Sequence, residues 1–390
     1  MREISLSKSG EQKLKTHQFE LKAQDAKDSL RSYTPGEWVR VRNSGHLAFV
    51  NPMLEEQPGA IQVIENSEND LDPMSLIEQR IRSAYEMRLL DPTYISGCRG
   101  FYGQADGLPG LIADVFTNTV LIQINTAGLD GHRDHIKNVF QSVWEREAHL
   151  LDNEKYREKE GLPKFPQEEI PAIEVSENSL RYELSPEVIQ KIGFYYDHRE
   201  NRLTLKNILS RLSHVPQSGL DLFCYAGAWG MNALNGGVQH IDFVDQGSFS
   251  EEIRRALELN GFQNRGSFHR ADVFKFIDDA IAAKKKYELI LCDPPAFAKS
   301  AHQKRSALEG YSKLHRKVIR TLASKGIVVF SSCTHYVNPE EFQKTILEAS
   351  YKENRKLRLL HCGHQGWDHP TPATFDKSNY IKSFFYRLEN

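Results

Sequence analysis

The chain has 390 residues, with 50 lysines and arginines against 52 aspartates and glutamates, and its formal net charge is −2. This near balance excludes uniform basicity, the electrostatic footprint of many nucleic-acid-binding domains, but leaves open where the charges lie. A hydrophobic content of 39% and a charged content of 26% exclude a disordered or fibrous chain. The length predicts two or three domains.

The sequence carries no visible targeting signal. No apolar run approaches the roughly 20 residues that a membrane-spanning helix needs. The start, MREISLSKSG, lacks the apolar region of a secretory signal. Five scattered cysteines without a Cys-x-x-Cys pair are typical of a reducing compartment: Cys98, Cys224, Cys292, Cys333 and Cys362. We therefore expect a cytoplasmic protein that does not contact a membrane.

The first predicted domain covers residues 1–73 and is rich in β-structure. A weak helical pattern covers residues 14–26, and Pro35-Gly36 is a turn signal. Alternating or apolar runs then predict strands at residues 37–41, 47–50 and 60–64. The acidic stretch over residues 65–73 is predicted to be a linker.

The second predicted domain covers residues 74–186 and combines helices with strands. Helical patterns lie at residues 75–90 and 128–148, and strand patterns at residues 95–102, 110–116 and 120–124. The charged residues 149–169 are predicted to form a surface loop or helix extension. Short strands at 172–175 and 180–184 are predicted to close this α+β layer.

In the third predicted domain, residues 187–390, apolar strands alternate with helices. The predicted strands cover residues 219–223, 240–244, 266–269, 289–292 and 326–331. The predicted helices cover residues 200–212, 229–235, 250–260, 273–283, 311–322 and 339–350. Nearly continuous apolar strands that alternate with helices favour an α/β, Rossmann-like fold with a mainly parallel sheet covered on both faces.

The loop after the first of these strands contains a glycine turn. It runs Asp221-Leu222-Phe223-Cys224-Tyr225-Ala226-Gly227 and leads into a helix, so Asp221, Phe223, Tyr225 and Gly227 are candidate cofactor-binding residues. A tight strand-to-helix turn explains the glycine equally well. The turn lacks the glycines of a dinucleotide fingerprint, which disfavours a nicotinamide-dependent oxidoreductase.

Acidic residues follow the next two strands. Asp245 can hold the two hydroxyls of a ribose, and Asp272 can accept a hydrogen bond from an adenine amino group. Each alone is better explained as a helix cap. Their succession after a glycine turn favours a nucleoside cofactor.

The fourth strand ends in Asp293-Pro294-Pro295-Ala296-Phe297. Two successive prolines forfeit backbone donors and fix an extended turn, which few structural needs explain. This run resembles motif IV of class I S-adenosylmethionine-dependent methyltransferases that act on bases. The resemblance implies S-adenosylmethionine as cofactor, with Asp293 beside it, and Pro294, Pro295 and Phe297 against the substrate.

Cys333 follows the fifth strand, and it is a candidate nucleophile beside the predicted cofactor cleft. Free cysteine is more often a small buried hydrophobe, and we assign that role to the other four. Carbon 5 of cytosine is a poor nucleophile until a thiolate adds at carbon 6. A cytosine-C5 methyltransferase therefore needs such a cysteine, with Asp293 to orient the base and assist proton transfer.

Three further segments carry a more specific resemblance. Residues 105–114, 191–202 and the pair 368–370 with 380–382 are similar to signatures of the bacterial 23S rRNA 5-methylcytosine methyltransferases. Members join an N-terminal PUA domain, a central EEHEE domain and a Rossmann-like catalytic domain. The resemblance implies these three domains here, 23S rRNA as partner, and Phe194 and Arg199 near the cofactor. The glycine turn departs from the family's Ser-Tyr-Thr-Gly-Gly-Phe.

Local charge predicts an RNA-binding track. Residues 299–325 hold eight lysines and arginines against Glu309, a local charge of +7, and residues 191–211 add five more against two acids. A solvated helix face is the ordinary explanation of a charge run. Because both runs adjoin the cofactor loops, we interpret them as phosphate contacts, with Lys299 and Arg305 as substrate-binding residues.

Alternatives remain at this stage. His361, Cys362, His364 and His369 have zinc-ligand chemistry, but their spacing is too tight, and a loop over the cleft without metal is favoured. An rRNA N-methyltransferase on guanine or adenine also uses Asp-Pro-Pro-aromatic motifs. A non-catalytic RNA-binding assembly factor is a further alternative. The oligomeric state is open, with a homodimer as one option.

Overall fold

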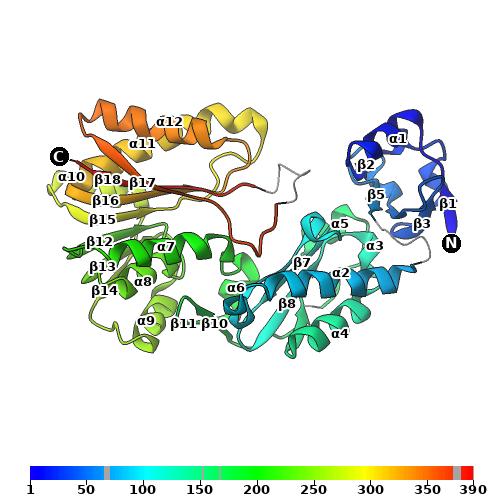
Figure 1. Ribbon diagram of the computed structural model, residues 1–390, viewed down its shortest axis with the longest axis horizontal. Coiled ribbons are helices and arrows are strands. Elements are labelled where there is room, and N and C mark those ends of the chain that lie inside the picture. The colour runs from blue at the N-terminus through cyan, green and yellow to red at the C-terminus, as the bar shows by residue number, and fades with distance from the viewer. Residues whose placement is uncertain (66–70, 152, 167, 372–378, 390) are drawn as a thin grey trace. The chain divides into compact units, whose positions relative to one another are not determined.

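The computed structural model describes residues 1–65, 71–151, 153–166, 168–371 and 379–389. Its chain divides into two compact units (Figure 1). Unit 1 comprises residues 1–173 and 367–376, and unit 2 comprises residues 174–366 and 377–390. No helix within the described residues is both long and apolar enough to cross a bilayer.

The beginning of unit 1 is a five-stranded sheet with the order β1-β3-β4-β5-β2. Its strands are β1 (Arg2–Ile4), β2 (Glu20–Leu21), β3 (Glu37–Val41), β4 (Leu47–Val50) and β5 (Ile61–Ile64). The three predicted strands are confirmed. The helix predicted at residues 14–26 is wrong, because α1 (Lys8–Lys15) begins where the Ser7 side chain caps it, and Leu21 is buried in β2.

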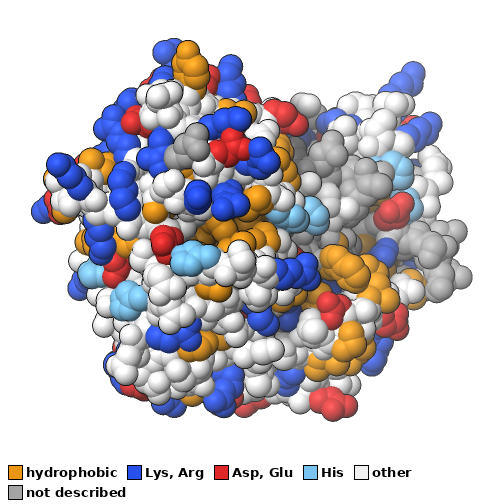
Figure 2. All heavy atoms as spheres, turned by 60° about the vertical axis from the view of Figure 1, so that its left-hand side comes forward, with side chains coloured by type: hydrophobic (Ala, Val, Ile, Leu, Met, Phe, Trp, Pro, Cys, Tyr) orange, Lys and Arg blue, Asp and Glu red, His pale blue; other side chains and the backbone are white. Residues whose placement is uncertain are grey.

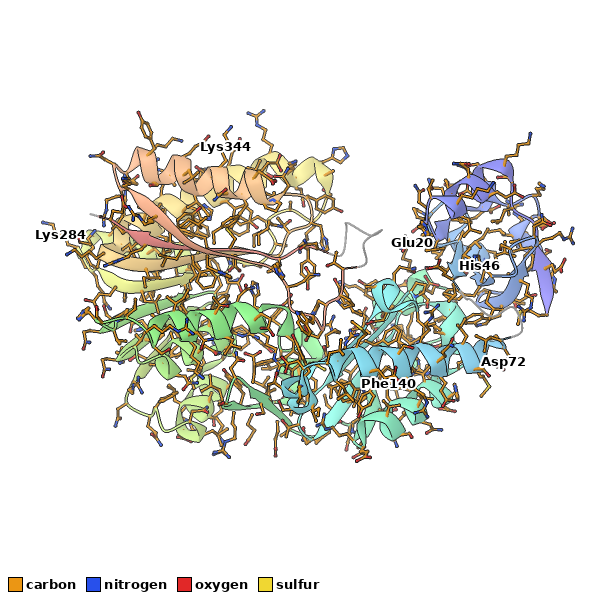
Figure 3. All side chains as sticks on the ribbon, in the orientation of Figure 1. Glu20, His46, Asp72, Phe140, Lys284 and Lys344 are labelled. Atoms are coloured by element: carbon orange, nitrogen blue, oxygen red, sulfur yellow. The ribbon has the colours of Figure 1, made fainter. Side chains whose placement is uncertain are left out.

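A second sheet of unit 1 has the order β6-β7-β8-β9. It consists of β6 (Cys98–Tyr102), β7 (Leu111–Val115), β8 (Thr119–Ile124) and β9 (Glu147–Leu150). Helices α2 (Pro73–Arg88) and α4 (Arg133–Trp144) pack beside it. Asp72 caps the start of α2, where Figure 3 labels it.

Two predictions for this region are wrong in extent. The helix predicted at residues 128–148 is α3 (Ala127–Asp130), α4 and then β9, because Glu145 adopts a left-handed conformation that ends α4. The strand predicted from residue 95 begins only at Cys98, after a 3₁₀ turn over Pro92–Ser96. The charged stretch 149–169 contains the end of β9 and α5 (Glu154–Lys159).

The first sheet of unit 1 has a hydrophobic core of its own and also contributes residues to the core of the second sheet. Phe49 and Ile64 of the first sheet belong to the same buried cluster as Phe140 of α4, which Figure 3 labels. The Trp38 indole also donates a hydrogen bond to the carbonyl oxygen of Gly128 at 2.7 Å.

The strands β10 (Ile173–Glu177) and β11 (Leu180–Leu184) form a separate two-stranded sheet. The prediction that they close the α+β layer of the second domain is therefore wrong. Hydrogen bonds tie them to α9 (Ser250–Leu259) and the residue after it. Asn260 bonds the backbone of Arg181 in both directions, and Arg255 pairs with Glu183 at 3.0 Å.

Unit 2 is built on a seven-stranded sheet with the order β14-β13-β12-β15-β16-β18-β17. Five strands are parallel, namely β12 (Ser218–Leu222), β13 (His240–Asp245), β14 (Gly266–Arg270), β15 (Tyr287–Cys292) and β16 (Leu322–Ser332). They confirm the predicted strands and the α/β fold class. The antiparallel β17 (Leu357–Gly363) and β18 (Lys382–Leu388) were not predicted.

Helices cover both faces of this sheet (Figure 1). One face carries α7 (Arg199–Leu209), α8 (Ala228–Asn235) and α9; the other carries α10 (Val273–Ala282), α11 (Lys304–Thr321) and α12 (Pro339–Lys352). The helix predicted from residue 311 begins seven residues earlier, and α6 (Pro186–Ile192) was not predicted. The doubly covered sheet explains the nearly continuous apolar strands.

The pairing register places the ends of the parallel strands at one edge. Leu222 lies beside Val244 and Cys292, and Cys292 lies beside Phe330. The loops that follow β12, β13, β15 and β16 therefore leave the sheet side by side. This edge is where ligands bind in open parallel sheets.

Candidate active site

The loop after β12 is a turn of left-handed residues. Phe223, Tyr225 and Gly227 have φ angles of 60°, 48° and 80°. Non-glycine residues avoid this conformation, and such strain clusters at ligand sites. At Gly227 an added Cβ would lie 3.1 Å from the Phe243 ring, so only glycine suits this position. The predicted glycine turn thus has a conformation that a simple strand-to-helix connection does not require.

Asp221 holds this turn from the inside. It is 1% exposed, and its carboxylate accepts a hydrogen bond at 2.8 Å from the backbone nitrogen of Gly230 in α8. Burial, together with the nearby Asp293 and Asp245 carboxylates, raises the pKa of Asp221 to about 8. Its geometry is that of a buried support for the turn.

Asp245 ends β13 with its carboxylate oriented by two backbone amides. Oδ2 accepts from the nitrogen of Tyr225 at 3.1 Å, and Oδ1 accepts from the nitrogen of Gly247 at 2.8 Å. The Tyr225 ring lies 4.9 Å from the ring of Phe249 and 5.4 Å from that of Tyr195. A fixed carboxylate beside an aromatic wall fits a nucleoside, whose ribose hydroxyls donate and whose base stacks.

Asp272 is exposed and is the N-cap residue of α10. Its Oδ1 accepts from the backbone nitrogen of Lys275 at 2.9 Å, so its helix-cap role is present. A cap leaves the second carboxylate oxygen available to another donor. The rings of Phe223 and Phe274 lie 6.5 Å apart beside this cap. A nucleobase contact is therefore compatible with the cap.

Asp293 follows β15 and is fixed through one oxygen. Its Oδ2 accepts from the Trp229 indole nitrogen at 3.0 Å and lies 3.4 Å from Nε2 of His198. Within the described residues its Oδ1 accepts no hydrogen bond. The carboxylate is thus held in one orientation with an acceptor available to a substrate amino group.

The Pro-Pro loop is fastened to the end of β16. Pro294 is buried, Pro295 is exposed, and the Phe297 ring stacks on Tyr311 of α11 at 4.6 Å. The Tyr311 hydroxyl bonds the Ser332 hydroxyl at 2.9 Å, and Thr334 donates to the carbonyl oxygen of Ala298 at 2.9 Å. The loop therefore forms a rigid wall next to Cys333.

Cys333 lies directly after β16, beside the loop that carries Asp293. Its side chain is partly exposed, whereas Cys98, Cys224 and Cys292 are buried. Burial, followed by the negative charges of Asp293 and Asp197, raises the pKa of the Cys333 thiol to about 12. The structure thus brings the two predicted catalytic residues together and leaves the thiol protonated at neutral pH.

Lys382 is a neighbour of this pair that the sequence analysis missed. In the register of β16 and β18, Lys382 lies beside Ser332. Its Nζ donates to the carbonyl oxygens of Thr334 at 2.6 Å and Tyr380 at 2.8 Å. Burial lowers the pKa of Lys382 to about 8. Trp229, His198 and Tyr195 were also missed, although two of them lie within the segment 191–202.

Two predicted cofactor contacts, Phe194 and Arg199, have buried side chains. Phe194 packs against Tyr182 of β11 and Tyr196, with ring centroids 5.1 and 5.2 Å apart. Arg199, at the start of α7, is 2% exposed. The exposed aromatic residue of this segment is Tyr195, in a left-handed conformation beside Tyr225.

The basic stretch 299–325 is less basic in space than in sequence. Ion pairs engage five of its cations: Lys304 with Glu341, Arg305 with Glu309, Lys317 with Asp278, and Arg316 and Arg320 with Glu353. Figure 2 shows Lys and Arg side chains gathered in the upper part of its face, at the height of α11 and α12. Asp and Glu side chains lie among them.

The basic residues of this stretch also differ in their distance from the Pro-Pro loop. Helix α11 has 18 residues and spans about 27 Å. Its first residues adjoin the Pro-Pro loop, whereas its end leads to the far end of β16. Lys299 and Arg305 are exposed near the site, while Arg320 and Lys325 lie toward the opposite edge.

The second basic stretch, 191–211, does not form a cationic surface as a whole. Arg202 is buried and pairs with Glu177 at 2.5 Å, with a second contact at 2.7 Å, and Arg199 is buried as well. The prediction of a continuous phosphate track is wrong for these two residues, because their side chains stabilise the inside of unit 2.

The cluster of histidine and cysteine near residue 362 is only partly a loop. His361 and Cys362 lie on β17, paired with Phe385 and Phe384 of β18, so the interpretation as a loop is wrong for these two. His364 and His369 lie outside the strands and helices. Within the described residues no group of three or more His, Cys, Asp or Glu side chains is arranged to hold a metal ion.

Comparison with known families agrees with this geometry. Residues 128–383, about two thirds of the chain, match the family model described as S-adenosylmethionine-dependent methyltransferase. The chain is 29% identical over 306 residues to the ribosomal RNA large subunit methyltransferase I of Yersinia pseudotuberculosis, covering 75% of each chain. The Yersinia pestis protein of that name has the same identity and coverage.

Two solved structures share the fold over nearly the whole chain. A putative methyltransferase from Streptococcus mutans has a TM-score of 0.74 at 20% identity, covering 99% of this chain and all of that one. A putative methyltransferase complexed with SAH gives a TM-score of 0.77 with the same identity and coverage. These likenesses support the fold.

Proposed function

The chain belongs to the family of S-adenosylmethionine-dependent methyltransferases, and we propose that it methylates carbon 5 of a cytosine in 23S ribosomal RNA. The two curated relatives are methyltransferases of large-subunit ribosomal RNA by name, which supports this class of substrate. The choice of cytosine rests on Cys333 and Asp293, at the ends of the neighbouring strands β16 and β15.

S-adenosylmethionine, the cofactor of this family, supplies an electrophilic methyl group on a sulfonium. The residues at the strand ends fit it. The amide-held Asp245 carboxylate suits the ribose hydroxyls, and the aromatic side chains of Tyr225 and Phe249 suit a flat base. The strained turn at Phe223, Tyr225 and Gly227 brings backbone close to the ligand.

The pairing of Cys333 with Asp293 carries the proposal. The register places Cys292 beside Phe330. Asp293 directly follows Cys292, and Cys333 comes three residues after Phe330, so both lie at the same edge of the sheet. Thr334 and Tyr311 fasten the loop of one to the strand of the other. A methyltransferase that modifies only exocyclic nitrogens has no chemical need for a thiol at this position.

The reaction follows from these residues. The Cys333 sulfur, as thiolate, forms a bond to carbon 6 of cytosine; the electron pair of the C5–C6 double bond forms a C4–C5 double bond, and N3 takes up a proton, to give an enamine. Carbon 5 then forms a bond to the sulfonium methyl group as the bond from that methyl to sulfur breaks, which leaves a neutral thioether. A base removes the proton from carbon 5, the C5–C6 double bond reforms, and the thiolate leaves. We assign to Asp293 Oδ1 the hydrogen bond from the cytosine amino group.

The remaining parts of the chain are proposed to bind RNA. We propose a PUA-like domain over residues 1–73, an EEHEE domain over 74–186 and the catalytic domain over 187–390. Lys299 and Arg305, exposed near the Pro-Pro loop, are proposed phosphate contacts. The target cytosine has to leave any base stack to reach Cys333, as bases do in other modifying enzymes.

The high pKa of the Cys333 thiol favours one competing function. A thiol that stays protonated at neutral pH adds poorly to a base. Asp293 with Phe297 alone suits methylation of an exocyclic amino group on guanine or adenine. The proposal therefore requires a means of forming the thiolate.

Nucleoside analysis tests the proposed function. Purified protein, S-adenosylmethionine carrying a deuterated methyl group, and unmodified 23S rRNA are incubated, and the RNA is digested for mass spectrometry. We expect labelled 5-methylcytidine, and none with Cys333→Ala. Labelled N-methylguanosine or N-methyladenosine would contradict the proposal, as would 5-methylcytidine formed at the full rate by Cys333→Ala.

A further inference from the structure

The interior of unit 2 contains a lysine without an acidic partner. Lys382 is 5% exposed, and within the described residues no carboxylate lies within ion-pair distance of its Nζ. Among the described residues, its Nζ donates hydrogen bonds to the carbonyl oxygens of Thr334 and Tyr380. Burial of an unpaired cation is unfavourable, so buried lysines in proteins are usually paired.

The position of Lys382 connects it to Cys333. Strand β18 runs antiparallel to β16 with Lys382 opposite Ser332, the residue before the cysteine. Its Nζ then bonds the carbonyl oxygen of Thr334, the residue after the cysteine, at 2.6 Å. The Lys382 ammonium thus contacts the backbone of the residue after Cys333, and the Lys382 backbone pairs with the residue before it. Burial lowers the pKa of Lys382, whereas the charge of Cys333 raises it.

We propose that Lys382 is the positioning residue that provides the positive charge for the Cys333 thiolate, so that the nucleophile is a thiolate–ammonium pair. This inference rests on the proposed function and answers its main difficulty, which is how a buried thiol ionises. The thiol proton goes to water when Lys382 is already an ammonium, or to the Lys382 amine when it is not. Both routes end in the same pair, with the sulfur negative and Nζ positive.

The acidic groups that act on Cys333 oppose its ionisation. Asp293, after β15, and Asp197, in the 3₁₀ turn Tyr196–His198, both raise the pKa of the thiol. Asp197 accepts a hydrogen bond at 2.7 Å from the Tyr380 hydroxyl. The nearby Tyr195 and Tyr311 phenols have pKa values raised by burial and stay neutral. Among the charged groups that act on the Cys333 thiol, Lys382 favours the thiolate, as does a backbone hydrogen bond at Cys333.

Thiol alkylation as a function of pH tests this inference without RNA. The protein carries Cys362→Ser, because Cys362 is the one exposed cysteine of the five. The Cys333 thiolate displaces iodide from iodoacetamide to form a carbon–sulfur bond, and peptide mass spectrometry follows that residue alone. Three variants are compared with this background: Lys382→Gln, Lys382→Arg and Lys344→Gln. Lys344 is a control, exposed on α12, where Figure 3 labels it.

We expect Lys382→Gln, which keeps a donor but loses the charge, to lower the alkylation rate at pH 8 by about tenfold or more, equivalent to a rise of at least one unit in the thiol pKa. Lys382→Arg should stay within about threefold of the background, and Lys344→Gln should match it. Equal rates for Lys382→Gln and the background, from pH 6 to pH 10, would overturn the inference.

Two outcomes keep the test decisive. Should Lys382→Gln fail to fold by circular dichroism, the background protein alone decides. Its alkylation rate should rise with pH and then level off as the Cys333 thiolate forms beside the Lys382 ammonium. A rate that is still rising steeply above about pH 11 would overturn the inference. If alkylation depends on Lys382 but no 5-methylcytidine forms, the pair survives and the proposed function fails.

Discussion

The two halves of the catalytic sheet edge are built in different ways. At the ends of β12 and β13, Asp221 and Asp245 are held by backbone amides. At the ends of β15, β16 and β18, Asp293 and Lys382 act in opposite directions on the ionisation of Cys333, and burial shifts the pKa of both Cys333 and Lys382. The first half is suited to hold a ligand in a fixed place, and the second to form and release a bond.

The half at the ends of β12 and β13 and the half at the ends of β15, β16 and β18 should therefore respond differently to substitution. Changes on the amide-held side should alter the affinity for S-adenosylmethionine or the stability of the fold. Changes on the other side should alter turnover and its pH dependence with little effect on cofactor affinity. The following predictions test this division.

Cys333→Ala should have the largest effect. We expect methyl transfer to fall by at least about a thousandfold, since removal of a covalent nucleophile eliminates the reaction path. The affinity for S-adenosylmethionine, measured by calorimetry, should stay within about threefold of wild type. A comparable loss of cofactor affinity would show that Cys333 contributes to cofactor binding, and it would contradict the proposed division between the two halves.

Asp221→Asn should change the pH dependence of stability. The folded-state pKa of Asp221, about 8, lies above the ordinary 3.8, so its protonated form is favoured by folding. Stability that is present below pH 4 is therefore lost as the pH rises toward 8, by up to about 1.4 kcal/mol per pH unit. Asparagine can still accept from Gly230 without ionising.

Urea unfolding between pH 5 and pH 8 measures this difference. The free energy of unfolding of wild type should fall more steeply with pH than that of Asp221→Asn. Parallel curves for the two proteins would show that Asp221 ionises normally inside the fold, contrary to its burial.

Asp245 and Asp272 offer a matched pair of smaller effects. Asp245→Asn should weaken S-adenosylmethionine binding about 10- to 100-fold, because hydrogen bonds to a charged acceptor contribute about 1.5–3 kcal/mol. Asp272→Asn should change it less than about threefold, since asparagine also caps helices and also accepts from an amino group. Calorimetry with both variants measures the ratio, and equal effects would contradict the proposed ribose contact of Asp245.

The smallest effects are expected from surface charge. Arg305→Ala should lower the salt dependence of RNA binding by about 0.7 in slope, the value of one phosphate contact to a single strand. Arg320 pairs with Glu353 toward the far end of α11, so Arg320→Ala should leave the slope unchanged. Filter binding from 50 to 300 mM salt measures both. An equal decrease for the two variants would argue for nonspecific attraction to the helix.

Local signals in the sequence were sufficient for the parallel half of the fold. In β15 the run Leu289–Cys292 is apolar because helices cover both faces of the sheet, and the ends of such strands could be recognised from Asp245, Asp293 and Cys333. The antiparallel β17 and β18 were missed. In β17 the run Leu357–Gly363 lacks β-branched residues, so only its pairing with β18 makes it a strand.

What the sequence could not predict depends on contacts between distant residues. Lys382 lies 50 residues after Ser332, its partner across the sheet, and Trp229 lies 64 residues before Asp293. The local charge of +7 in residues 299–325 likewise omitted Glu341, Asp278 and Glu353, which fold back onto those cations. Strand-end chemistry is readable locally, whereas orientation and neutralisation of a side chain are decided by the fold.

Trapping with RNA that contains 5-fluorocytosine tests the central claim most directly. Fluorine at carbon 5 cannot leave as a proton does, so the bond between Cys333 and carbon 6 persists after methyl transfer. We predict a denaturation-resistant complex of protein and RNA that requires S-adenosylmethionine, with the linked peptide containing Cys333, and no complex with Cys333→Ala. The absence of a complex with wild type, or its persistence in Cys333→Ala, would contradict the account.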